Sequence, residues 1–524
     1  MAKGDADLAQ RVTDMLAVST ETFDERVEED AKALVEAIEE GAFDNLQSTV
    51  GLEYEFYCVD DSGALARVPR RTLELPGIEK ELGLHNVELN TSPQPFTEHG
   101  LAAQEMEVRA RLEAVQRVMA AEGRRLVSDS LWVIPPNGET ATEYVTDSVE
   151  RTVETDEGNR TVRIAANMSD AARYHAMANT SSSRAAGMRI DVPNVSLQAD
   201  TVMPESLITS IQPHVQIRHA ADLPVVFTYA LRVAGPLLAL GVASPLLPPS
   251  WYDDVPTETI LEEAWAEHRI PVFESVLNAP DGRFEKVRFP RDIGSVEEAV
   301  QRVVDDETFV PMPVERGNRF DDRFAHFCCK HGTYWRWVRP VFDGPTRASA
   351  STRLEFRPLS SQPTVSDSLA FLAAFGGLME SLPKLQHPVI DLPWETAREN
   401  FYDAMRNGLE SEQAWITVDG VETTDTKRVT AELLDLAAEG LRSRGVSENR
   451  TETVLAPLRH RVSEWRTPAD WKLAVVENEV RTGADLGTAT ERMQREFLDL
   501  QAETLEAGSF TEWPAPERVK AGRN

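Results

Sequence analysis

Lysine and positive charge are in short supply in this sequence. Only nine of the 54 basic residues are lysine, against 87 acidic residues, and the net charge is −33. The acids are spread along the whole chain rather than gathered in a tail. Such a chain lacks the basic patch that nucleic acids and anionic membranes require, so we expect neither as a partner. Dispersed acidity with little lysine is typical of a high-salt cytoplasm, where screening removes the self-repulsion.

The sequence also lacks the marks of export and of membrane insertion. Three cysteines, Cys58, Cys328 and Cys329, are too few for a disulfide framework in 524 residues. No basic segment leads into an apolar run at the beginning of the chain, as it would in a signal peptide. The most apolar stretch, residues 223–249, contains Arg232 and several prolines, which favours a buried helix. We therefore expect a cytoplasmic protein.

Several familiar motifs are missing as well. The chain has no P-loop, no GxGxxG after a strand, no HExxH and no paired CxxC. Changes in composition predict an N-terminal helical segment over residues 1–45, an α+β catalytic core over 46–390 and a C-terminal helical layer over 391–524. An acidic insertion interrupts the core at about 276–322.

Within the core, two further helices and one irregular region are expected. Residues 363–382 form an apolar run typical of a buried helix, and residues 137–200 are polar and predict loops and short elements. An amphipathic helix is expected over residues 101–126. Its apolar side would consist of Leu101, Met106, Val108, Leu112, Val115, Val118 and Met119.

Four strand-like segments carry polar residues on one side and apolar residues on the other. They are LEYEF (52–56), HNVELN (85–90), SIQPHVQIR (210–218) and STRLEFR (351–357). Because side chains alternate along a strand, each segment turns its polar residues to a single face. These residues are Glu53, Glu55, Asn86, Glu88, Asn90, His214, Gln216, Arg218, Arg353, Glu355 and Arg357.

The residue types on this face suit metal-assisted phosphoryl chemistry. Glu53 and Glu55 would lie about 7 Å apart on a strand, close enough to need a counter-charge if buried. Carboxylate oxygens are the ligands that Mg²⁺ prefers, and Arg353 and Arg357 could clamp a phosphate or carboxylate. An ordinary half-exposed strand alternates in the same way. A hydrolase using two carboxylates about 5–10 Å apart is a second chemistry that the acids alone would allow.

The same segments carry a resemblance to a known family. Together with RY (173–174), GPLLALGVASPLL (235–247), HRIPVF (268–273), HGTYWRWVRP (331–340) and RLEFRPLSSQPTVSD (353–367), they resemble the glutamate–cysteine ligase family of carboxylate–amine ligases. Members of that family are related to glutamine synthetase by fold. The resemblance covers about residues 47–385, and leaves the 276–322 insertion and the C-terminal layer outside.

The resemblance implies a curved antiparallel sheet of the glutamine synthetase type whose concave face holds ATP and metal ions. It implies Mg²⁺, with Mn²⁺ as an alternative, on Glu53, Glu55, Glu88 and Glu355. It gives His214, Arg353 and Arg357 catalytic roles at the phosphates or the substrate carboxylate. The residues expected to contact the cofactor are Gln216, Arg218, Arg339 and Trp335, although Trp335 and Trp337 could equally form a core pair.

The implied reaction activates the γ-carboxylate of glutamate as an acyl phosphate and joins it to an amine. Cysteine is the expected amine, which would place the chain in γ-glutamylcysteine or glutathione biosynthesis. Two departures leave the amine open: SSQPT (360–364) replaces an AGPT-like turn, and Pro213 and Gln216 replace histidine-rich versions. The alternatives are a γ-glutamyl ligase for another amine and a non-catalytic ligase-like binding or regulatory protein. A homo-oligomer is compatible with either.

Overall fold

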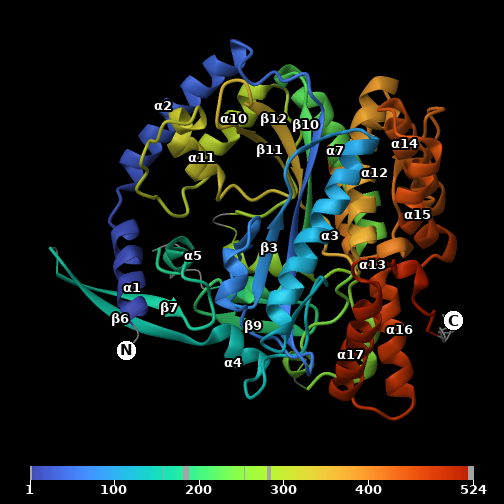
Figure 1. Ribbon diagram of the computed structural model, residues 1–524, viewed down its shortest axis with the longest axis horizontal. Coiled ribbons are helices and arrows are strands. Elements are labelled where there is room, and N and C mark those ends of the chain that lie inside the picture. Colours follow the sequence, from blue (N-terminus) through green and yellow to red (C-terminus); the bar gives the residue numbers. More distant parts are fainter. Residues whose placement is uncertain are drawn as a thin grey trace.

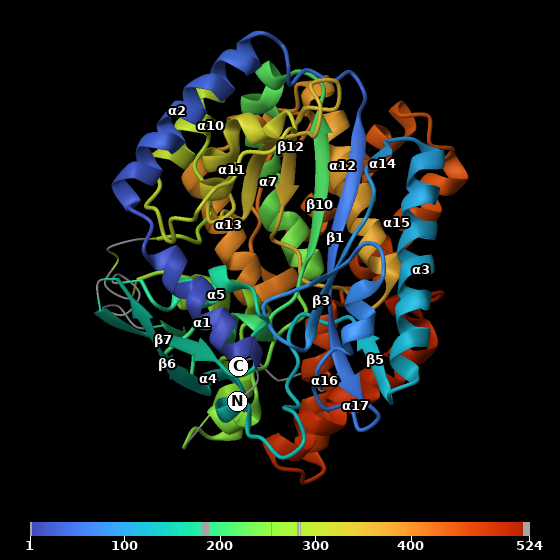
Figure 2. The same cartoon turned by 60° about the vertical axis from the view of Figure 1, so that its left-hand side comes forward.

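An antiparallel sheet of eight strands runs through the middle of the molecule (Figures 1 and 2). The computed structural model describes residues 3–516 except 157, 181–187, 253, 280–281 and 283–284. Six strands follow the order β11-β12-β10-β1-β3-β2, and β4 and β5 also pair with β1. The strands are β1 (Thr49–Asp60), β2 (Ile78–Lys80), β3 (Asn86–Asn90), β4 (Gln94–Pro95), β5 (Arg124–Val127), β10 (Ile211–Ile217), β11 (Val338–Asp343) and β12 (Ser351–Phe356).

The register of this sheet brings the predicted polar residues onto one face. Glu55 lies opposite Glu88 across β1 and β3, and His214 lies opposite Glu355 across β10 and β12. Residues that face each other across an antiparallel pair project to the same side. The expected α+β class with a curved antiparallel sheet is confirmed, and each of the four alternating segments contributes a strand to it.

The other face of the sheet is apolar and packs on two long helices. Tyr54 and Phe56 of β1 are fully buried there, and the Phe356 ring stacks on Phe375 with centroids 4.3 Å apart. The helices are α7 (Leu223–Gly241) and α12 (Val365–Leu385). Segments Ala220–Gly241 and Val365–Leu385 are long and apolar enough to cross a membrane, but they are 78% and 89% buried inside the protein. Their burial is that of core helices, as expected for both regions.

Helices and hairpins close over the polar face of the sheet. Helices α2 and α11 pack together on the side of β12, while α5 lies toward the other end of the sheet (Figure 2), and α9 packs against β8 and the 3₁₀ turn η2. These elements are α1 (Lys3–Leu16), α2 (Thr20–Glu39), α4 (Ala141–Thr146), α5 (Ala172–Met177), η2 (Met203–Leu207), α8 (Thr257–Glu262), α9 (Arg269–Leu277), α10 (Val296–Val304), α11 (Ala325–His331), and the hairpins β6–β7 (Ser148–Thr155, Gly158–Ala165) and β8–β9 (Met188–Val192, Val195–Ala199).

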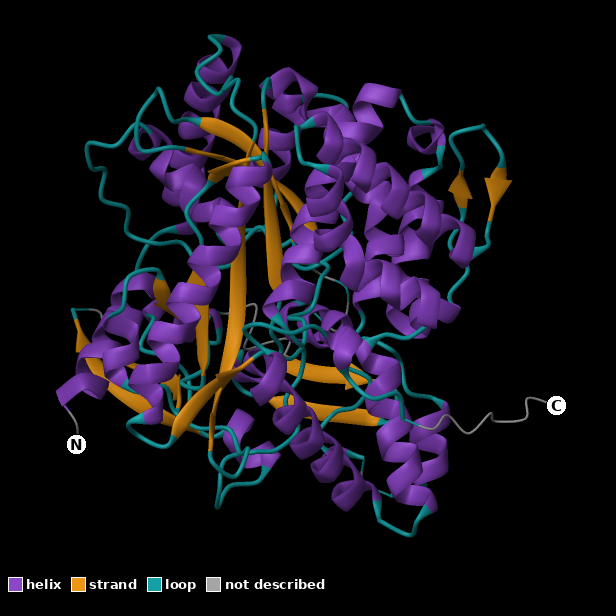
Figure 3. Cartoon of the chain, turned by 45° about the vertical axis from the view of Figure 1, so that its right-hand side comes forward, coloured by secondary structure: helices purple, strands orange, loops and turns teal. Residues whose placement is uncertain are grey.

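A layer of C-terminal helices packs against α7 and α12 (Figure 1), and Figure 3 shows how much of the molecule around the strands is helical. The buried Arg461 links this layer to the core, because its guanidinium donates to the carboxylate of Asp367 at 3.1 Å and to the backbone oxygen of Leu240 at 2.8 Å. The layer contains α13 (Trp394–Asn407), the short β13–β14 ladder (Trp415–Ile416, Glu422–Thr423), α14 (Thr426–Ser443), α15 (Glu448–Glu464), α16 (Pro468–Arg481) and α17 (Leu486–Thr504).

The predicted 101–126 helix needs two corrections. Helix α3 spans Glu98–Ala120 and then stops, because Gly123 takes a left-handed φ of +63° and residues 124–127 form β5 beside β1. Met106, assigned to the apolar side, is 67% exposed. The polar region 137–200 contains short elements, as expected: within its described residues these are two β-hairpins and two short helices.

Candidate active site

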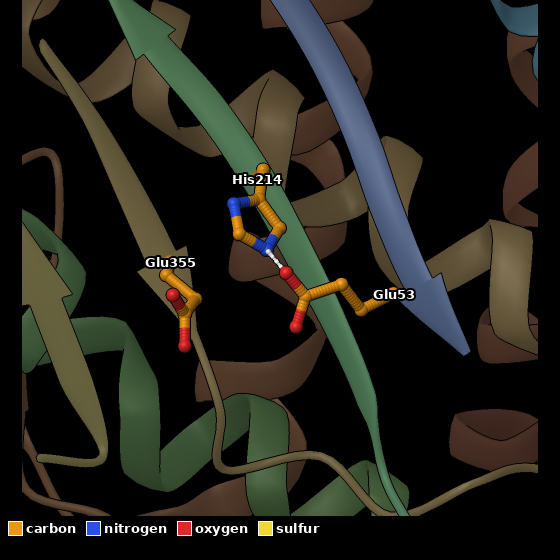
Figure 4. A group of neighbouring side chains, drawn as sticks. All are labelled: Glu53, His214 and Glu355. Carbon is orange, nitrogen blue, oxygen red and sulfur yellow. Dashed lines mark ion pairs between the residues drawn. The ribbon is translucent and has the colours of Figure 1, made fainter. Parts of the chain in front are cut away.

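Three strands bring Glu53, His214 and Glu355 together on the polar face (Figure 4). They come from β1, β10 and β12, which are adjacent in the sheet. The His214 Nε2 lies 3.1 Å from a Glu53 carboxylate oxygen, and Nδ1 accepts a hydrogen bond from Arg353 Nε at 3.1 Å. One ligand atom from each of the three residues lies within 4.8 Å of the others. We call this the histidine group.

The charges of the histidine group are balanced by neighbouring cations. Burial acts to raise the pKa of the Glu53 carboxyl, but its electrostatic interaction and hydrogen bond with His214 outweigh burial and lower the pKa. Burial likewise opposes ionisation of Glu355, yet Arg339 and Arg357 hold its pKa well below the usual range. Arg339 Nε donates to Glu355 at 2.9 Å and Arg357 Nη1 donates at 2.5 Å. Both carboxylates are therefore ionised and compensated at neutral pH.

A second set of carboxylates lies beside the first and is less fully compensated. In this set Glu55 accepts hydrogen bonds from Ser210 and Gln212 and interacts with the charges of Arg269 and Arg357, yet burial still raises its pKa. Glu55 of β1, Glu88 of β3 and Glu81, which follows β2, place carboxylate oxygens within 4.8 Å of one another. Burial raises the pKa of all three, to about 8 for Glu81, where the nearby Glu55 charge adds to the effect. For Glu88 the next cause after burial is the Glu53 charge. We call this the glutamate group.

Both groups fit a divalent metal ion by their donor sets. The glutamate group offers only carboxylate oxygens, which suit Mg²⁺ or Mn²⁺, and its mutual repulsion would be relieved by a cation. The histidine group adds an imidazole nitrogen to two carboxylates, a mixed set that also accepts first-row metals. The four predicted metal ligands are thus divided between two neighbouring groups, Glu53 and Glu355 in one and Glu55 and Glu88 in the other.

Two cavities open onto these groups, and Glu53 lines both of them. The inner cavity has a volume of about 190 Å³ and contains Glu55, Glu81 and Glu88 in its wall. The outer cavity has a volume of about 650 Å³ and contains His214. Its wall also contains the ion pair of Arg353 with Asp343, and most of the rest is small or neutral polar residues, among them Asn45, Gln47, Thr49, Thr91, Ser349 and Ser351.

The predicted catalytic and cofactor-contacting residues are distributed between the cavities. Arg357, Arg339 and Trp335 line the inner cavity, whereas Arg353 and Gln216 line the outer one. The two arginines that flank Glu355 in sequence therefore serve different cavities. Trp337, the alternative partner of Trp335, is fully buried in the core and donates its indole N–H to Glu274 at 2.8 Å.

Arg218 does not join this group. Strand β10 ends at Ile217, and the Arg218 guanidinium pairs with Glu380 of α12 at 3.1 Å. It lines neither cavity. The expectation that the alternation continues to Arg218 overlooks the end of the strand, beyond which a side chain no longer follows the face of the sheet.

Sequence reasoning missed three residues of the inner cavity. Gln212 joins the two groups, because its amide N–H donates to Glu55 at 2.9 Å and its oxygen accepts from Arg357 at 2.6 Å. Glu81 follows the short strand β2, and Glu205 lies in the turn η2. Gln212 lies two residues before His214 in SIQPHVQIR, so the alternation along this strand could have identified Gln212 as a residue of the polar face. Neither glutamate belongs to an alternating run, which left no signal for them.

Two solved structures of low identity are similar to this chain. A bifunctional glutathione synthetase from Pasteurella multocida is 14% identical, with a TM-score of 0.50 over 87% of this chain and 53% of that protein. A glutamate–cysteine ligase from Francisella tularensis, solved with AMP, is 12% identical, with a TM-score of 0.49 over 88% and 92% of the two chains. No curated protein sequence matches this chain.

The fold and family place the chain among the ATP-dependent ligases that join a carboxylate to an amine. Residues 49–495 match glutamate–cysteine ligase family 2, and the chain belongs to this family. The match confirms the resemblance seen in the strands and extends it. It includes the 276–322 insertion and the C-terminal helices up to α17, which the resemblance had left outside.

Proposed function

We propose that the protein is a glutamate ligase that uses ATP and Mg²⁺ to join the γ-carboxylate of glutamate to an amine, with cysteine as the amine. Mn²⁺ could replace Mg²⁺ on the same oxygen ligands. The observation that carries the proposal is the meeting of two cavities at Glu53, where a nucleotide phosphate and a substrate carboxylate could approach each other.

The sizes and linings of the cavities suggest which substrate each takes. The outer cavity, about 650 Å³ with mostly neutral polar walls and with Arg353 paired to Asp343, suits a nucleotide. The inner cavity, about 190 Å³ with Arg339 and Arg357, suits a small amino acid. The γ-phosphate would then lie near the histidine group and the substrate carboxylate near the glutamate group.

The reaction would run in two steps. An oxygen of the γ-carboxylate attacks the γ-phosphorus of ATP, the bond to the β-phosphate oxygen breaks, and ADP leaves. The amine nitrogen then attacks the acyl carbon of the mixed anhydride, phosphate leaves, and the nitrogen loses a proton. Metal ions bound to Glu53, Glu55, Glu81, Glu88 and Glu355 would neutralise charge on the transferring phosphoryl group.

The side chains of this chain orient the reactants. Arg353 is positioned to contact a phosphate in the outer cavity, while Arg357 faces the inner cavity and is held by Glu355 and Gln212 at 2.5 and 2.6 Å. Such fixed donors stabilise developing charge without having to reorganise. No covalent nucleophile is needed, which agrees with buried cysteines whose thiol pKa values burial raises to about 12 for Cys58 and Cys328.

The test is amine-dependent phosphate release. Protein in molar salt is incubated with ATP, Mg²⁺, glutamate and a panel of amines headed by cysteine, and γ-glutamyl products are identified by mass spectrometry. We expect cysteine to stimulate phosphate release and to yield γ-glutamylcysteine. The variant Glu53→Gln should reduce turnover at least about 100-fold, because it changes the one carboxylate common to both cavities. If no amine in the panel stimulates phosphate release, the ligase proposal is overturned, and a different best amine would correct only the amine.

We also propose that the protein works in a high-salt cytoplasm, on the strength of the net charge of −33. Salt screens repulsion between surface carboxylates within a few ångströms at molar concentration. The circular dichroism of the purified protein should lose helical signal when molar salt is removed by dialysis. An unchanged spectrum in dilute buffer would contradict this proposal without affecting the ligase.

A further inference from the structure

One carboxylate in the inner cavity belongs to neither metal-ligand group. Glu205 lies in η2, the turn before β10, and lines the inner cavity beside Glu81. It has no place in the histidine group or the glutamate group, the two sets of three ligand atoms found within the described part of the chain. A divalent metal needs several such atoms around it. Glu205 is therefore poorly placed to be a metal ligand.

The turn that carries Glu205 is held firmly by buried hydrogen bonds. The Tyr57 hydroxyl donates to the Leu207 carbonyl at 2.6 Å, and His85 Nε2 lies 3.0 Å from the Ser206 carbonyl oxygen. The Ser206 hydroxyl donates to the Met203 carbonyl at 2.7 Å. By contrast, the Glu205 carboxylate makes no hydrogen bond or ion pair with the residues that the structure describes. A carboxylate held so firmly without a partner is costly unless a ligand supplies one.

The surroundings of Glu205 favour an organic cation. Tyr174, Phe273 and Trp335 line the same cavity, and the Arg357 guanidinium already lies over the Phe273 ring, 6.0 Å from its centroid, which shows that this wall accepts a cation. Aromatic faces attract ammonium groups but offer no ligand atoms to a hydrated metal ion. Burial, followed by the charges of Glu81 and Glu55, raises the pKa of Glu205 well above its usual range, as expected for an acid awaiting a cation.

The position of Glu205 along the sheet indicates which cation. Proceeding from η2 along β10, Gln212 faces the inner cavity, and His214 and Gln216 face the outer one. Glu205 thus lies at the end of the inner cavity away from the proposed nucleotide. An amino acid whose side-chain carboxylate reaches the glutamate group would direct its α-ammonium toward this end.

We propose that Glu205, together with the aromatic walls of Tyr174, Phe273 and Trp335, binds the α-ammonium group of the amino acid whose side-chain carboxylate is activated. This inference rests on the proposed ligase function and deepens it. It makes Glu205 a specificity-determining residue that separates α-amino dicarboxylic acids from plain dicarboxylic acids of equal length.

The test compares glutamate with glutarate, which has the same carbon chain and both carboxylates but no amino group. For the wild type we expect kcat/KM to be roughly 100-fold higher with glutamate, in phosphate release with a saturating amine. In Glu205→Gln we expect the KM for glutamate to rise roughly 10- to 100-fold, while glutarate kinetics, the KM for ATP and the Mg²⁺ concentration for half activity stay unchanged. Glutamate and glutarate titrations followed by tryptophan fluorescence provide a readout without turnover.

Glu274→Gln is the matched control. Glu274 is a half-buried glutamate on α9 that lies outside both cavities and accepts hydrogen bonds from Trp337 and Tyr402, which glutamine can also accept. Glu274→Gln should leave the ratio of kcat/KM for glutamate to kcat/KM for glutarate at the wild-type value.

An unchanged kcat/KM ratio in folded Glu205→Gln would overturn the inference, as would a rise confined to the Mg²⁺ requirement or to the KM for the amine. Wild-type protein that releases no phosphate with any amine would instead overturn the ligase proposal, and wild-type fluorescence that does not distinguish the two acids would overturn the inference independently.

Discussion

The two metal-ligand groups differ in how their charge is balanced. The carboxylates of the histidine group lie against His214, Arg339 and Arg357, and their pKa values are lowered. In the glutamate group, burial raises the pKa of all three carboxyls. Neighbouring glutamate charges add to this for Glu81 and Glu88, and Arg269 and Arg357 offset it only in part for Glu55. The first group is therefore preformed by protein contacts alone. In the second group, protons or a bound cation must relieve the remaining repulsion, which makes it the part of the site most sensitive to pH and to metal.

The largest effect is expected from breaking the compensated group at Glu355. The side chain is 3% exposed, and its removal leaves the guanidiniums of Arg339 and Arg357 buried without their carboxylate. Glu355→Ala should lower the free energy of unfolding by about 3–5 kcal/mol, because an unpaired buried charge remains. Activity should fall below detection. Urea unfolding followed by circular dichroism measures the first effect, and wild-type stability in this variant would contradict the compensation described.

An intermediate effect is expected from the glutamate group as pH changes. The pKa of Glu81 rises from an ordinary value of 4.5 to about 8 in the folded protein. A raised carboxyl pKa means that the folded state binds more protons, so its contribution to stability is complete below about pH 4.5 and is lost as pH rises toward 8. Metal-free protein in constant molar salt should become less stable between about pH 5.5 and 8, and Mg²⁺ should reverse the loss.

The control for this pH effect is Glu81→Gln, which removes the titrating carboxyl and keeps its shape. The urea midpoint of this variant should depend less on pH and respond less to Mg²⁺ than that of the wild type. Equal slopes in the two proteins would show that the charge of the glutamate group is already balanced within the fold.

The smallest effect is expected at Arg218, which lies outside both groups. Its side chain is 42% exposed and pairs with Glu380, so Arg218→Ala should cost about 0.2–1 kcal/mol of stability. The KM for ATP should stay within about twofold of the wild type. Arg353→Ala removes the same charge from the outer cavity and should raise that KM by at least about tenfold. Equal effects on the KM would show that Arg218 reaches the nucleotide after all.

Most of the sheet could be predicted from the sequence because its information is local. Alternation within LEYEF and STRLEFR determines which side of β1 and β12 each residue takes, and burial of Tyr54 and Phe356 follows. The same logic fails where a chain leaves its strand. It assigned Arg218 to the polar face although β10 ends one residue earlier. It also gave no signal for Glu81 and Glu205, because these side chains reach the cavity from a loop and from the 3₁₀ turn η2, respectively.

The shared position of Glu53 has a consequence for the order of events during turnover. The Glu53 carboxylate borders both cavities. A ligand that binds in one cavity and changes the charge of Glu53 therefore changes the binding free energy of the ligand in the other cavity, and linkage makes this coupling equal in both directions. Cooperation between the two substrates then needs no moving domain. The coupling between the two substrates acts through a single side chain, on a strand whose position is fixed by the hydrophobic core behind the sheet.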